Sequence, residues 1–279
     1  MSFIVNQSEV ARRRLELEQY LTANVLDGTC VCEHYASCRR SHPATFYEGQ
    51  LHHVGRYYGL ENQGVPFRIV VVGQEYGHPP ARVTMDDRYA MVMDSGLRHR
   101  FKGGEGYPAR NPHMKGTTSA LRLLLGISLG SDYPSEVLSV NEQQCQIFDT
   151  FALVNYLLCS AISNTGSRRG KATDLMKWNC REHFRESLRI LDPTVIVVQG
   201  KGFWDSCVRA SFDDVTHLTD SVYEARIGTL RTFVAALAHP SAGPPNNWGT
   251  NEKTPYLLGT VVPSLQWIRQ QLILGQLDV

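Results

Sequence analysis

One short segment limits what this chain can fold into more than any other. Residues 69–72 (IVVV) are all aliphatic and β-branched, and Gly73 ends the run. Such a run is typical of a strand that is buried on both faces of a parallel sheet. The next residues are Gln74, Glu75 and Tyr76. Because ligands of open α/β sheets bind beyond the carboxyl ends of the strands, we expect chemistry in this loop.

Three later segments show the same pattern and alternate with segments of helical periodicity. Strands are expected at 148–155, 194–200 and 232–241, and helices at 8–26, 116–127, 173–191, 201–212 and 258–274. Strands that alternate with helices predict a parallel sheet, because parallel neighbours need a crossover connection. The predicted fold class is therefore α/β, a three-layer α/β/α sandwich around a four-stranded parallel sheet.

The long connection between the first and second strands is predicted to be loop. Residues 73–115 are rich in Gly, Pro, Arg and His, and so long a connection inside a compact domain is usually functional. The helix after it is expected to start with Thr117 or Thr118 as its N-cap, because either hydroxyl can accept from a backbone N–H.

The composition indicates an ordinary globular chain with a single domain. Of 279 residues, 42% are hydrophobic and 20% are charged, as in chains that bury one large core. We expect residues 1–66, with a helix and a cysteine-rich stretch, to pack on an α/β core of residues 67–279. The N-terminal segment does not read as a secretory signal, and no apolar run is long enough to span a bilayer, so we expect a cytoplasmic protein. A net charge of +1 leaves any nucleic-acid surface to local clusters of Lys and Arg.

The seven cysteines are unevenly distributed along the chain. Three of them, Cys30, Cys32 and Cys38, lie close together near the N-terminus. Thiols stay reduced in the cytoplasm, so a disulfide framework is not expected, and a metal ion or an iron–sulfur cluster is a better explanation. The spacing does not match the common zinc patterns. Free thiols buried in the core are the alternative.

A carboxylate, an amide and an imidazole stand at the ends of predicted strands. Glu75 follows the first strand, Asn155 ends the second and His239 ends the fourth. Each residue alone has an ordinary explanation, as a solvated acid, a turn former or a strand-terminal hydrogen-bonding group. Together, at one edge of a parallel sheet, they predict a single crevice that is equipped for acid–base chemistry.

These strand ends and their flanks resemble the ordered motifs of the uracil-DNA glycosylase superfamily. The similar stretches are VVVGQEYGH, FALVNYLLC, LDPTVIVVQG and AHPSAGPPNNWG, and they extend from about Ile69 to Trp248. The resemblance implies a three-layer sandwich around four parallel strands. It therefore implies the same fold class as the alternation of strands and helices.

The resemblance also implies roles for individual residues. Gln74 and Glu75 would position or activate the attacking water, Asn155 would read a flipped-out pyrimidine, and His239 would stabilise the departing base anion. The chemistry agrees, because cleaving an N-glycosidic bond leaves an oxocarbenium-like sugar and an anionic base, and a preorganised donor at such an anion contributes roughly 3–4 kcal/mol. The amide of Asn155 offers a donor and an acceptor, which suits the Watson–Crick edge of a pyrimidine that has left the duplex.

A structural [4Fe–4S] cluster is implied by the same resemblance. In the cluster-bearing branches, two cysteines placed like Cys159 and Cys180 and a pair of cysteines near the N-terminus together hold the cluster. These four residues supply the four thiolates that such a cluster needs. Here we expect that pair to be Cys38 with either Cys30 or Cys32. The cysteines left over are expected to be packing residues, namely Cys145 and Cys207.

The chain departs from the family where the base would bind. Glu75 stands where the clusterless branch has an aspartate, which moves the carboxylate by about the length of a C–C bond. The family's stacking phenylalanine is missing, and we expect Tyr76, His113 or Met114 to line the pocket instead. These departures make a modified pyrimidine a competitor of plain uracil as the substrate.

The expected partner is DNA, single- or double-stranded, bound by a monomer. In the superfamily the loop after His239 enters the minor groove, and the apolar residues Pro244 and Trp248 are the expected wedge. Contacts to DNA outside the base pocket are also expected from polar and basic residues, namely Lys115, Arg168, Arg169 and Ser241.

The sequence therefore predicts a monofunctional DNA glycosylase that hydrolyses the N-glycosidic bond of a flipped uracil or modified cytosine and leaves an abasic site. No lysine ends a predicted strand, so a Schiff base is not expected. One alternative is the excision of hypermodified bases from phage DNA as a defence activity, and another is a non-catalytic module that binds modified DNA. A small-molecule hydrolase or a nucleotide-binding enzyme is disfavoured, because neither a phosphate loop nor a nucleophile elbow is present.

Overall fold

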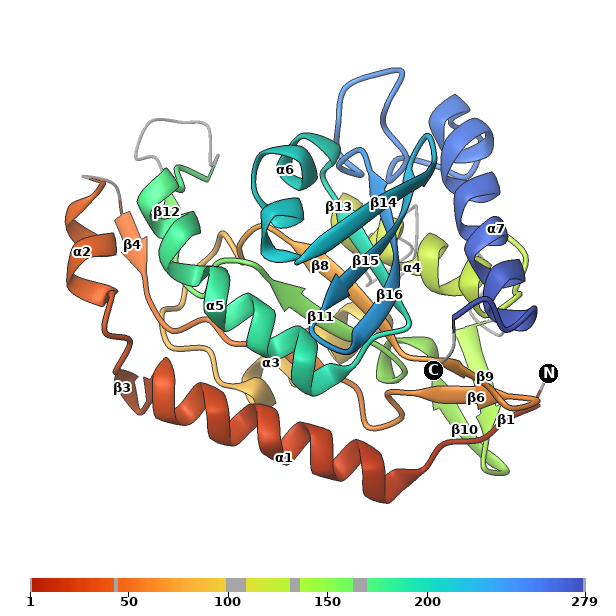
Figure 1. Cartoon of the computed structure of the whole chain (residues 1–279), viewed down its shortest axis with the longest axis horizontal. Helices are drawn as coiled ribbons and strands as arrows, with labels where there is room; N and C mark the ends of the chain where they lie inside the picture. Colours follow the sequence, from red (N-terminus) through yellow and green to blue (C-terminus); the bar gives the residue numbers. More distant parts are fainter. Residues whose placement is uncertain (1, 43–44, 99–108, 131–135, 163–169, 278–279) are drawn as a thin grey trace.

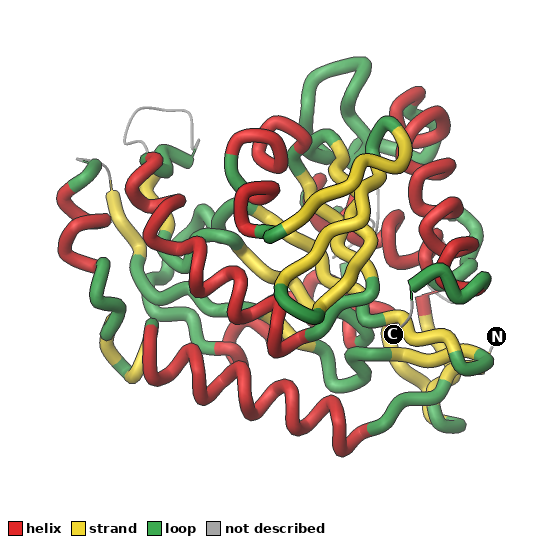
Figure 2. Tube along the Cα trace, viewed as in Figure 1, coloured by secondary structure: helices red, strands yellow, loops and turns green. Residues whose placement is uncertain are grey.

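The computed structural model describes residues 2–42, 45–98, 109–130, 136–162 and 170–277. At its centre is a seven-stranded sheet against which helices pack (Figure 1 and Figure 2). The strand order across the sheet is β14-β15-β16-β13-β8-β11-β5. In chain order the bounds are β5 His53–Val54, β8 Ile69–Gly73, β11 Ala152–Asn155, β13 Val195–Gln199, β14 Asp214–Thr219, β15 Val222–Ile227 and β16 Leu230–Leu237.

The four central strands, β16, β13, β8 and β11, run parallel to one another. In this register Asn155, at the end of β11, lies opposite Gly73 at the end of β8. Strands β8, β11 and β13 are buried along their whole length, as expected for aliphatic strands covered on both faces. The predicted α/β class is confirmed.

The sheet is larger than the four strands predicted. Strands β14 and β15 are added antiparallel beyond β16, and β5 is added antiparallel beyond β11. The second predicted strand is also shorter than expected. Residues Ile147–Asp149 form a 3-10 turn (η2) capped by Gln146, so β11 begins only at Ala152.

The predicted helices are present, some with different ends. Helix α5 packs against α1 and β11, whereas α7 packs against α4 and β16. None of the described helices has the length and apolarity needed to cross a membrane. The bounds are α1 Gln7–Asn24, α4 Pro112–Leu124, α5 Asp174–Leu191, α6 Lys201–Ser206 with the 3-10 turn η3 Val208–Ser211, and α7 Val262–Ile273 after the π-helical turn η4 Leu257–Val261.

Helix α4 begins at Pro112, and the predicted start at Thr117 or Thr118 is wrong. Asn111 is the N-cap, because its Oδ1 accepts from the backbone N–H of Met114 at 2.9 Å. Proline suits the first helical position, where the missing N–H would have no partner in the helix. The two threonine hydroxyls instead donate to backbone carbonyls one turn earlier in the same helix.

The prediction of a loop throughout residues 73–115 is also wrong. The segment contains α3, Met85–Gly96, which begins with a capping box. The backbone N–H of Asp87 donates to Thr84 Oγ1 at 3.1 Å, and the backbone N–H of Thr84 donates to Asp87 Oδ2 at 3.0 Å. These reciprocal bonds satisfy N–H groups that a helix start otherwise leaves without partners.

Short strands tie the N-terminal part of the chain to the rest. Residues of the N-terminal part also belong to the common hydrophobic core, where Leu17 of α1 and Val72 of β8 are both fully buried. The elements are β1 Ser2–Phe3, paired with β9 Val137–Val140, which in turn pairs with β10 Gln143–Gln146; the hairpins β2 Leu26–Asp27 with β3 Thr29–Cys30 and β6 Leu60–Asn62 with β7 Val65–Phe67; α2 Tyr35–Arg40; and β4 Thr45–Tyr47, paired with β12 Ser160–Ile162.

A buried group of charges connects α3 with α4. Glu136 Oε2 lies 2.6 Å from Arg110 Nη2, and its Oε1 lies 3.5 Å from Arg122 Nη1. Arg110 also donates to the carbonyl of Gly96 at the end of α3 and to Thr118 Oγ1 in α4. All three charged side chains are almost fully buried, so each depends on its partners rather than on water.

We predict that Glu136→Gln lowers the free energy of unfolding by about 3–5 kcal/mol, because it removes the carboxylate that compensates the buried guanidinium of Arg110. Urea denaturation of both proteins measures the difference. Glu18→Gln on the exposed side of α1 is the matched control and should change stability by less than about 0.5 kcal/mol. A loss at Glu136 as small as that of the control would contradict the prediction.

Candidate active site

A pocket of about 800 Å³ opens at the carboxyl ends of β8 and β11. Its wall is built from the loop after β8, from α3 and the start of α4, and from the residues after β16. The structure thus brings together segments that are far apart in the sequence. The lining includes every residue predicted for catalysis or base binding and one of those predicted for DNA contact, namely Gln74, Glu75, Tyr76, His113, Met114, Asn155, His239 and Ser241.

The side chain of Glu75 is a buried, hydrogen-bonded carboxyl group in the wall of this pocket. Burial raises its pKa to about 7, against the lowering effect of two donors. These donors are the backbone N–H of Ala161, 3.3 Å from Oε2, and Gln74 Nε2, 3.1 Å from Oε1. Gly170 leaves room for the carboxylate, since a Cβ there would lie 1.7 Å from Oε1. At neutral pH the group is therefore divided between its acidic and basic forms, as a general base requires.

Asn155 presents an unused donor to the pocket. Its side chain is 2% exposed, and Nδ2 has no hydrogen-bond partner among the described residues. Leaving a buried donor unpaired costs about 1–3 kcal/mol, which a ligand with a matching acceptor would recover. Gly73 gives this amide its room, because a Cβ at that position would lie 3.1 Å from Asn155 Oδ1.

The imidazole of His239 is held in one tautomer by Ser241. The backbone N–H of Ser241 donates to His239 Nδ1 at 3.2 Å, and Ser241 Oγ lies 2.8 Å from the same nitrogen. With Nδ1 acting as an acceptor, the proton of the neutral ring is on Nε2. Burial lowers the pKa of His239 although part of the ring is exposed, so the neutral form with a free Nε2–H donor is favoured at pH 7.

His113 and Met114, at the start of α4, complete the inner wall. The His113 ring stacks on that of His239 with centroids 6.4 Å apart and planes at 25°. Burial lowers the pKa of His113 to about 3, and the neighbouring His239 and Arg88 lower it further. Met114 is 4% exposed. Both side chains line the pocket, as predicted.

Sequence reasoning missed the contribution of α3. Arg88 and Met91 of this helix line the pocket. Both contact Tyr76: the Arg88 guanidinium carbon lies 4.2 Å from the centroid of the Tyr76 ring, and the Tyr76 hydroxyl donates to Met91 Sδ at 3.3 Å. The signal that could have revealed them is the Thr84–Asp87 capping box.

The residues predicted to contact DNA outside the pocket differ in how exposed their side chains are. Pro244 is exposed, and Lys115 is half-buried with its pKa lowered by burial. The prediction that Trp248 is a wedge is wrong, because its side chain is 0% exposed and its Nε1 donates to the carbonyl of Ala238 at 2.6 Å. The other two basic residues, Arg168 and Arg169, lie outside the described residues.

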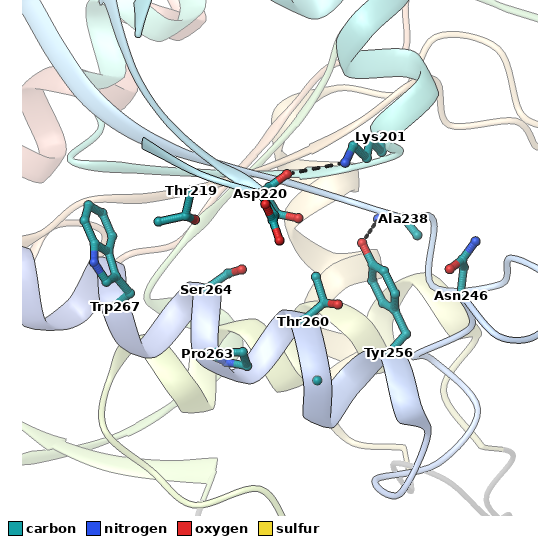
Figure 3. A pocket seen from close by; sticks show the side chains of 12 residues that line it. Lys201, Thr219, Asp220, Ala238, Asn246, Tyr256, Thr260, Pro263, Ser264 and Trp267 are labelled. Atoms are coloured by element: carbon teal, nitrogen blue, oxygen red, sulfur yellow. Dashed lines mark hydrogen bonds between the residues drawn. The ribbon is translucent and has the colours of Figure 1, made fainter. Parts of the chain in front are cut away.

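A second pocket, of about 730 Å³, lies between the β14–β15 turn and the start of α7 (Figure 3). None of the predicted site residues lines it. In Figure 3 the Tyr256 side chain reaches Ala238, whose backbone N–H donates to the tyrosine oxygen at 2.9 Å. Tyr256 therefore fixes the residue that directly precedes His239.

Five cysteines from distant parts of the sequence gather at one place. The thiol of Cys159, just after β11, is hydrogen-bonded to that of Cys30 on β3, which lowers the pKa of Cys30 to about 7 and raises that of Cys159. Burial raises the pKa of Cys180 on α5, and the thiols of Cys38 and Cys32 raise it further. These five are the cysteines predicted as ligands.

The donor chemistry of this group fits an iron–sulfur cluster. Four thiolates are what such a cluster needs, and five thiols lie close enough to affect one another's ionisation. Within the part of the chain that the structure describes, no three Cys, His, Asp or Glu side chains are yet arranged around a single metal position. Cys32 differs from the rest, because its Sγ lies 3.7 Å from Nε2 of His183.

Comparison with known proteins does not extend these observations. A scan against protein-family models gives no match, and a search of curated proteins gives no significant one. The function must therefore be inferred from the site itself.

The raised pKa of Glu75 predicts a pH-dependent cost to stability. A carboxyl whose pKa is higher in the folded than in the unfolded state stabilises the fold at low pH and loses that contribution as the pH rises through its folded pKa. The neutral isostere Glu75→Gln does not carry this cost. We predict that its stability relative to the wild type increases by roughly 2 kcal/mol between about pH 5 and about pH 8.5.

Urea denaturation at the two pH values measures this change. Glu142→Gln, at an exposed position of the β9–β10 hairpin, is the control and should give a difference that does not vary with pH. If the difference at Glu75 were equally constant, the carboxyl would have an ordinary pKa and could not serve as a base poised near neutrality.

Proposed function

We propose that this protein is a DNA glycosylase that binds a flipped-out pyrimidine, uracil or a modified cytosine, and hydrolyses its N-glycosidic bond to leave an abasic site. The observation that carries the proposal is the convergence of Glu75, Asn155 and His239 on one pocket at the carboxyl ends of parallel strands. We also propose the finer fold implied by the motifs, a three-layer sandwich of the uracil-DNA glycosylase type. On this proposal the protein acts on DNA as a monomer in the cytoplasm.

Glu75 supplies the base for the attacking water. The water oxygen bonds to C1′ of the sugar while the bond from C1′ to the base nitrogen breaks, and the electron pair of that bond leaves with the base. Glu75 accepts a proton from the water. Its pKa of about 7 suits this task, because a general base works best near the operating pH. Gln74, hydrogen-bonded to Oε1, fixes the orientation of the carboxylate.

His239 and Asn155 act on the base. The Nε2–H of neutral His239 donates to the anionic oxygen that develops on the leaving base, where a preorganised donor contributes roughly 3–4 kcal/mol. The amide of Asn155 pairs with the Watson–Crick edge: its unpartnered Nδ2 donates to a ring or carbonyl acceptor, and Oδ1 accepts from an N–H of the base. Flipping costs a few kcal/mol, so these contacts must offset the loss of stacking.

The pocket volume favours a modified pyrimidine as a second candidate substrate. At about 800 Å³, it lies in the range of sites that hold drug-sized ligands, and uracil is much smaller than these. Excision of a hypermodified base from phage DNA as a defence activity fits such a pocket. Base release measured on DNAs that contain uracil, mismatched thymine or a modified cytosine distinguishes the two roles and also tests the third possibility, a non-catalytic DNA-binding module.

We predict that Glu75→Gln and His239→Ala each lower the rate of base release by about 10²–10³-fold while DNA affinity changes little. Wild-type kcat/KM should rise with pH through about 7 as Glu75 ionises, and Glu75→Gln should abolish this rise. Single-turnover release and fluorescence anisotropy with a pyrimidine-lesion duplex measure both properties. Glu142→Gln is the control, and full activity in both site variants would show that the site lies elsewhere.

We further propose that the gathered cysteines hold a structural [4Fe–4S] cluster, with Cys30, Cys38, Cys159 and Cys180 as ligands. Cys30 is favoured over Cys32 because its thiol is hydrogen-bonded to that of Cys159, whereas the Sγ of Cys32 lies 3.7 Å from Nε2 of His183. The cluster would join the N-terminal segment to β11 and α5. It would supply stability to the fold rather than chemistry to the pocket.

Anaerobically purified protein should accordingly be brown and contain iron and acid-labile sulfide in equal amounts. Serine at Cys30, Cys38, Cys159 or Cys180 should remove most of the iron, whereas Cys32→Ser should retain it. Cys145→Ser is the matched control, since Cys145 is also buried but donates to the backbone carbonyl of Gln146. A colourless protein that contains zinc would refute the cluster, and loss of iron in Cys32→Ser but not Cys30→Ser would reverse the ligand assignment.

A further inference from the structure

Within the described parts of the chain, the buried guanidinium of Arg88 has no acidic partner. The side chain is 7% exposed, its guanidinium carbon lies 4.2 Å from the centroid of the Tyr76 ring, and the guanidinium is also hydrogen-bonded to the Tyr76 side chain. Among the described residues Nε has no hydrogen-bond partner, and no carboxylate lies within ion-pair distance. A buried charge is normally paired, because its removal from water costs several kcal/mol.

The other charged groups of the pocket do not fill this role. Asp94, on the same helix, forms an ion pair with Arg98 at 2.6 Å and is largely exposed. The pKa of Glu75 is shifted by burial, Ala161 and Gln74, with no contribution from Arg88. Burial lowers the pKa of Arg88 to about 10, so the guanidinium still carries its charge at neutral pH. The described lining of the pocket therefore contains a fixed cation without a counter-charge.

A guanidinium is suited to one kind of ligand in particular. Its planar fork of N–H donors matches the two oxygens of a carboxylate or phosphate, which it binds by paired, charge-assisted hydrogen bonds. Asn155 Nδ2, in the same wall, is a second buried donor that finds no partner in the described segments. A neutral pyrimidine can satisfy Asn155 but leaves Arg88 uncompensated. A nucleotide that also brings an anionic oxygen group satisfies both.

We propose that Arg88 binds an anionic oxygen group of the substrate nucleotide and thereby sets the substrate class of this pocket. The identity of the ligand as a nucleotide rests on the function proposed above, whereas the binding of an anion by Arg88 does not. The group has two possible sources with the same chemistry: an acidic substituent on the pyrimidine ring, or the backbone phosphate next to the flipped nucleotide. The experiment below distinguishes them.

The informative variant is Arg88→Met, which removes the charge and keeps most of the apolar volume. Arg98→Met is the matched control, because Arg98 belongs to the same pocket but is exposed and already paired with Asp94. Urea denaturation should show that Arg88→Met is at least as stable as the wild type, since the replaced charge had no carboxylate partner among the described residues to lose. A folded variant is thus available for binding measurements.

Base release is compared on duplexes with 5-carboxyuracil, 5-methyluracil or uracil, and on a uracil duplex with a neutral methylphosphonate beside the target. If the base supplies the anion, Arg88→Met lowers kcat/KM about 10- to 100-fold on 5-carboxyuracil alone. If the phosphate supplies it, the variant loses that much on every duplex with a normal backbone, and the methylphosphonate reproduces the loss in the wild type. Equal activity of variant and wild type on all four duplexes overturns the proposal.

A second measurement keeps this test separate from the glycosylase proposal. Uracil-5-carboxylate, uracil and inorganic phosphate are titrated into the wild type, Arg88→Met and Arg98→Met and followed by calorimetry. Arg88→Met should weaken binding of an anionic probe at least about tenfold, and Arg98→Met should not. This outcome supports Arg88 as an anion site even if no duplex is cleaved, whereas equal binding by all three proteins rejects it even if the enzyme proves to be a glycosylase.

Discussion

The site depends on the parallel pairing of β8 with β11. That register places Asn155 opposite Gly73, and the absence of a side chain at Gly73 leaves room for two functional groups. A Cβ there would lie 3.1 Å from Asn155 Oδ1 and 3.4 Å from His113 Cε1. A shift of one residue would turn every side chain of β11 to the other face of the sheet, so the aliphatic runs that bury both strands also decide which groups reach the pocket. Core packing and site geometry are therefore set by the same interaction.

Burial then sets the protonation states. Burial raises the pKa of Glu75 and lowers those of His113 and His239. At neutral pH the pocket therefore combines a carboxyl group that is partly ionised with two uncharged imidazoles. Asn155 Nδ2 and Arg88 Nε add donors that have no partner among the described residues. Each of these features costs folding free energy, and a compact domain has only about 5–15 kcal/mol to spare. Such a cost is typical of sites that are preorganised for a ligand or a transition state.

The sequence predicted the strand ends well, because an aliphatic run that stops at a polar residue depends only on local pattern. Glu75, Asn155 and His239 line one pocket for that reason. The sequence pattern did not predict α3, whose capping box at Thr84 lies in a segment dominated by Gly, Pro and Arg. Arg88, which lies on α3, was missed for the same reason. The burial of Trp248 could not be predicted from the local sequence. Its burial follows from the close approach of α4 to the loop after β16, where a Cβ at Gly116 would lie 2.5 Å from Pro240 Cγ and 3.1 Å from Trp248 Cη2.

The burial of Trp248 gives that residue a different role in the same site. Its Nε1 donates to the carbonyl of Ala238, while the N–H of Ala238 donates to the Tyr256 hydroxyl. Both backbone groups of the residue before His239 are thus held by side chains from other elements. On the other side of His239, Ser241 fixes the tautomer of the ring. An imidazole secured from both sides would lose little freedom if negative charge developed beside it, and a donor that needs no reorganisation is the most effective stabiliser of developing charge. On the proposed function, the loop after β16 would serve the chemistry through its buried parts, and its exposed residues 243–246 would be free to meet DNA.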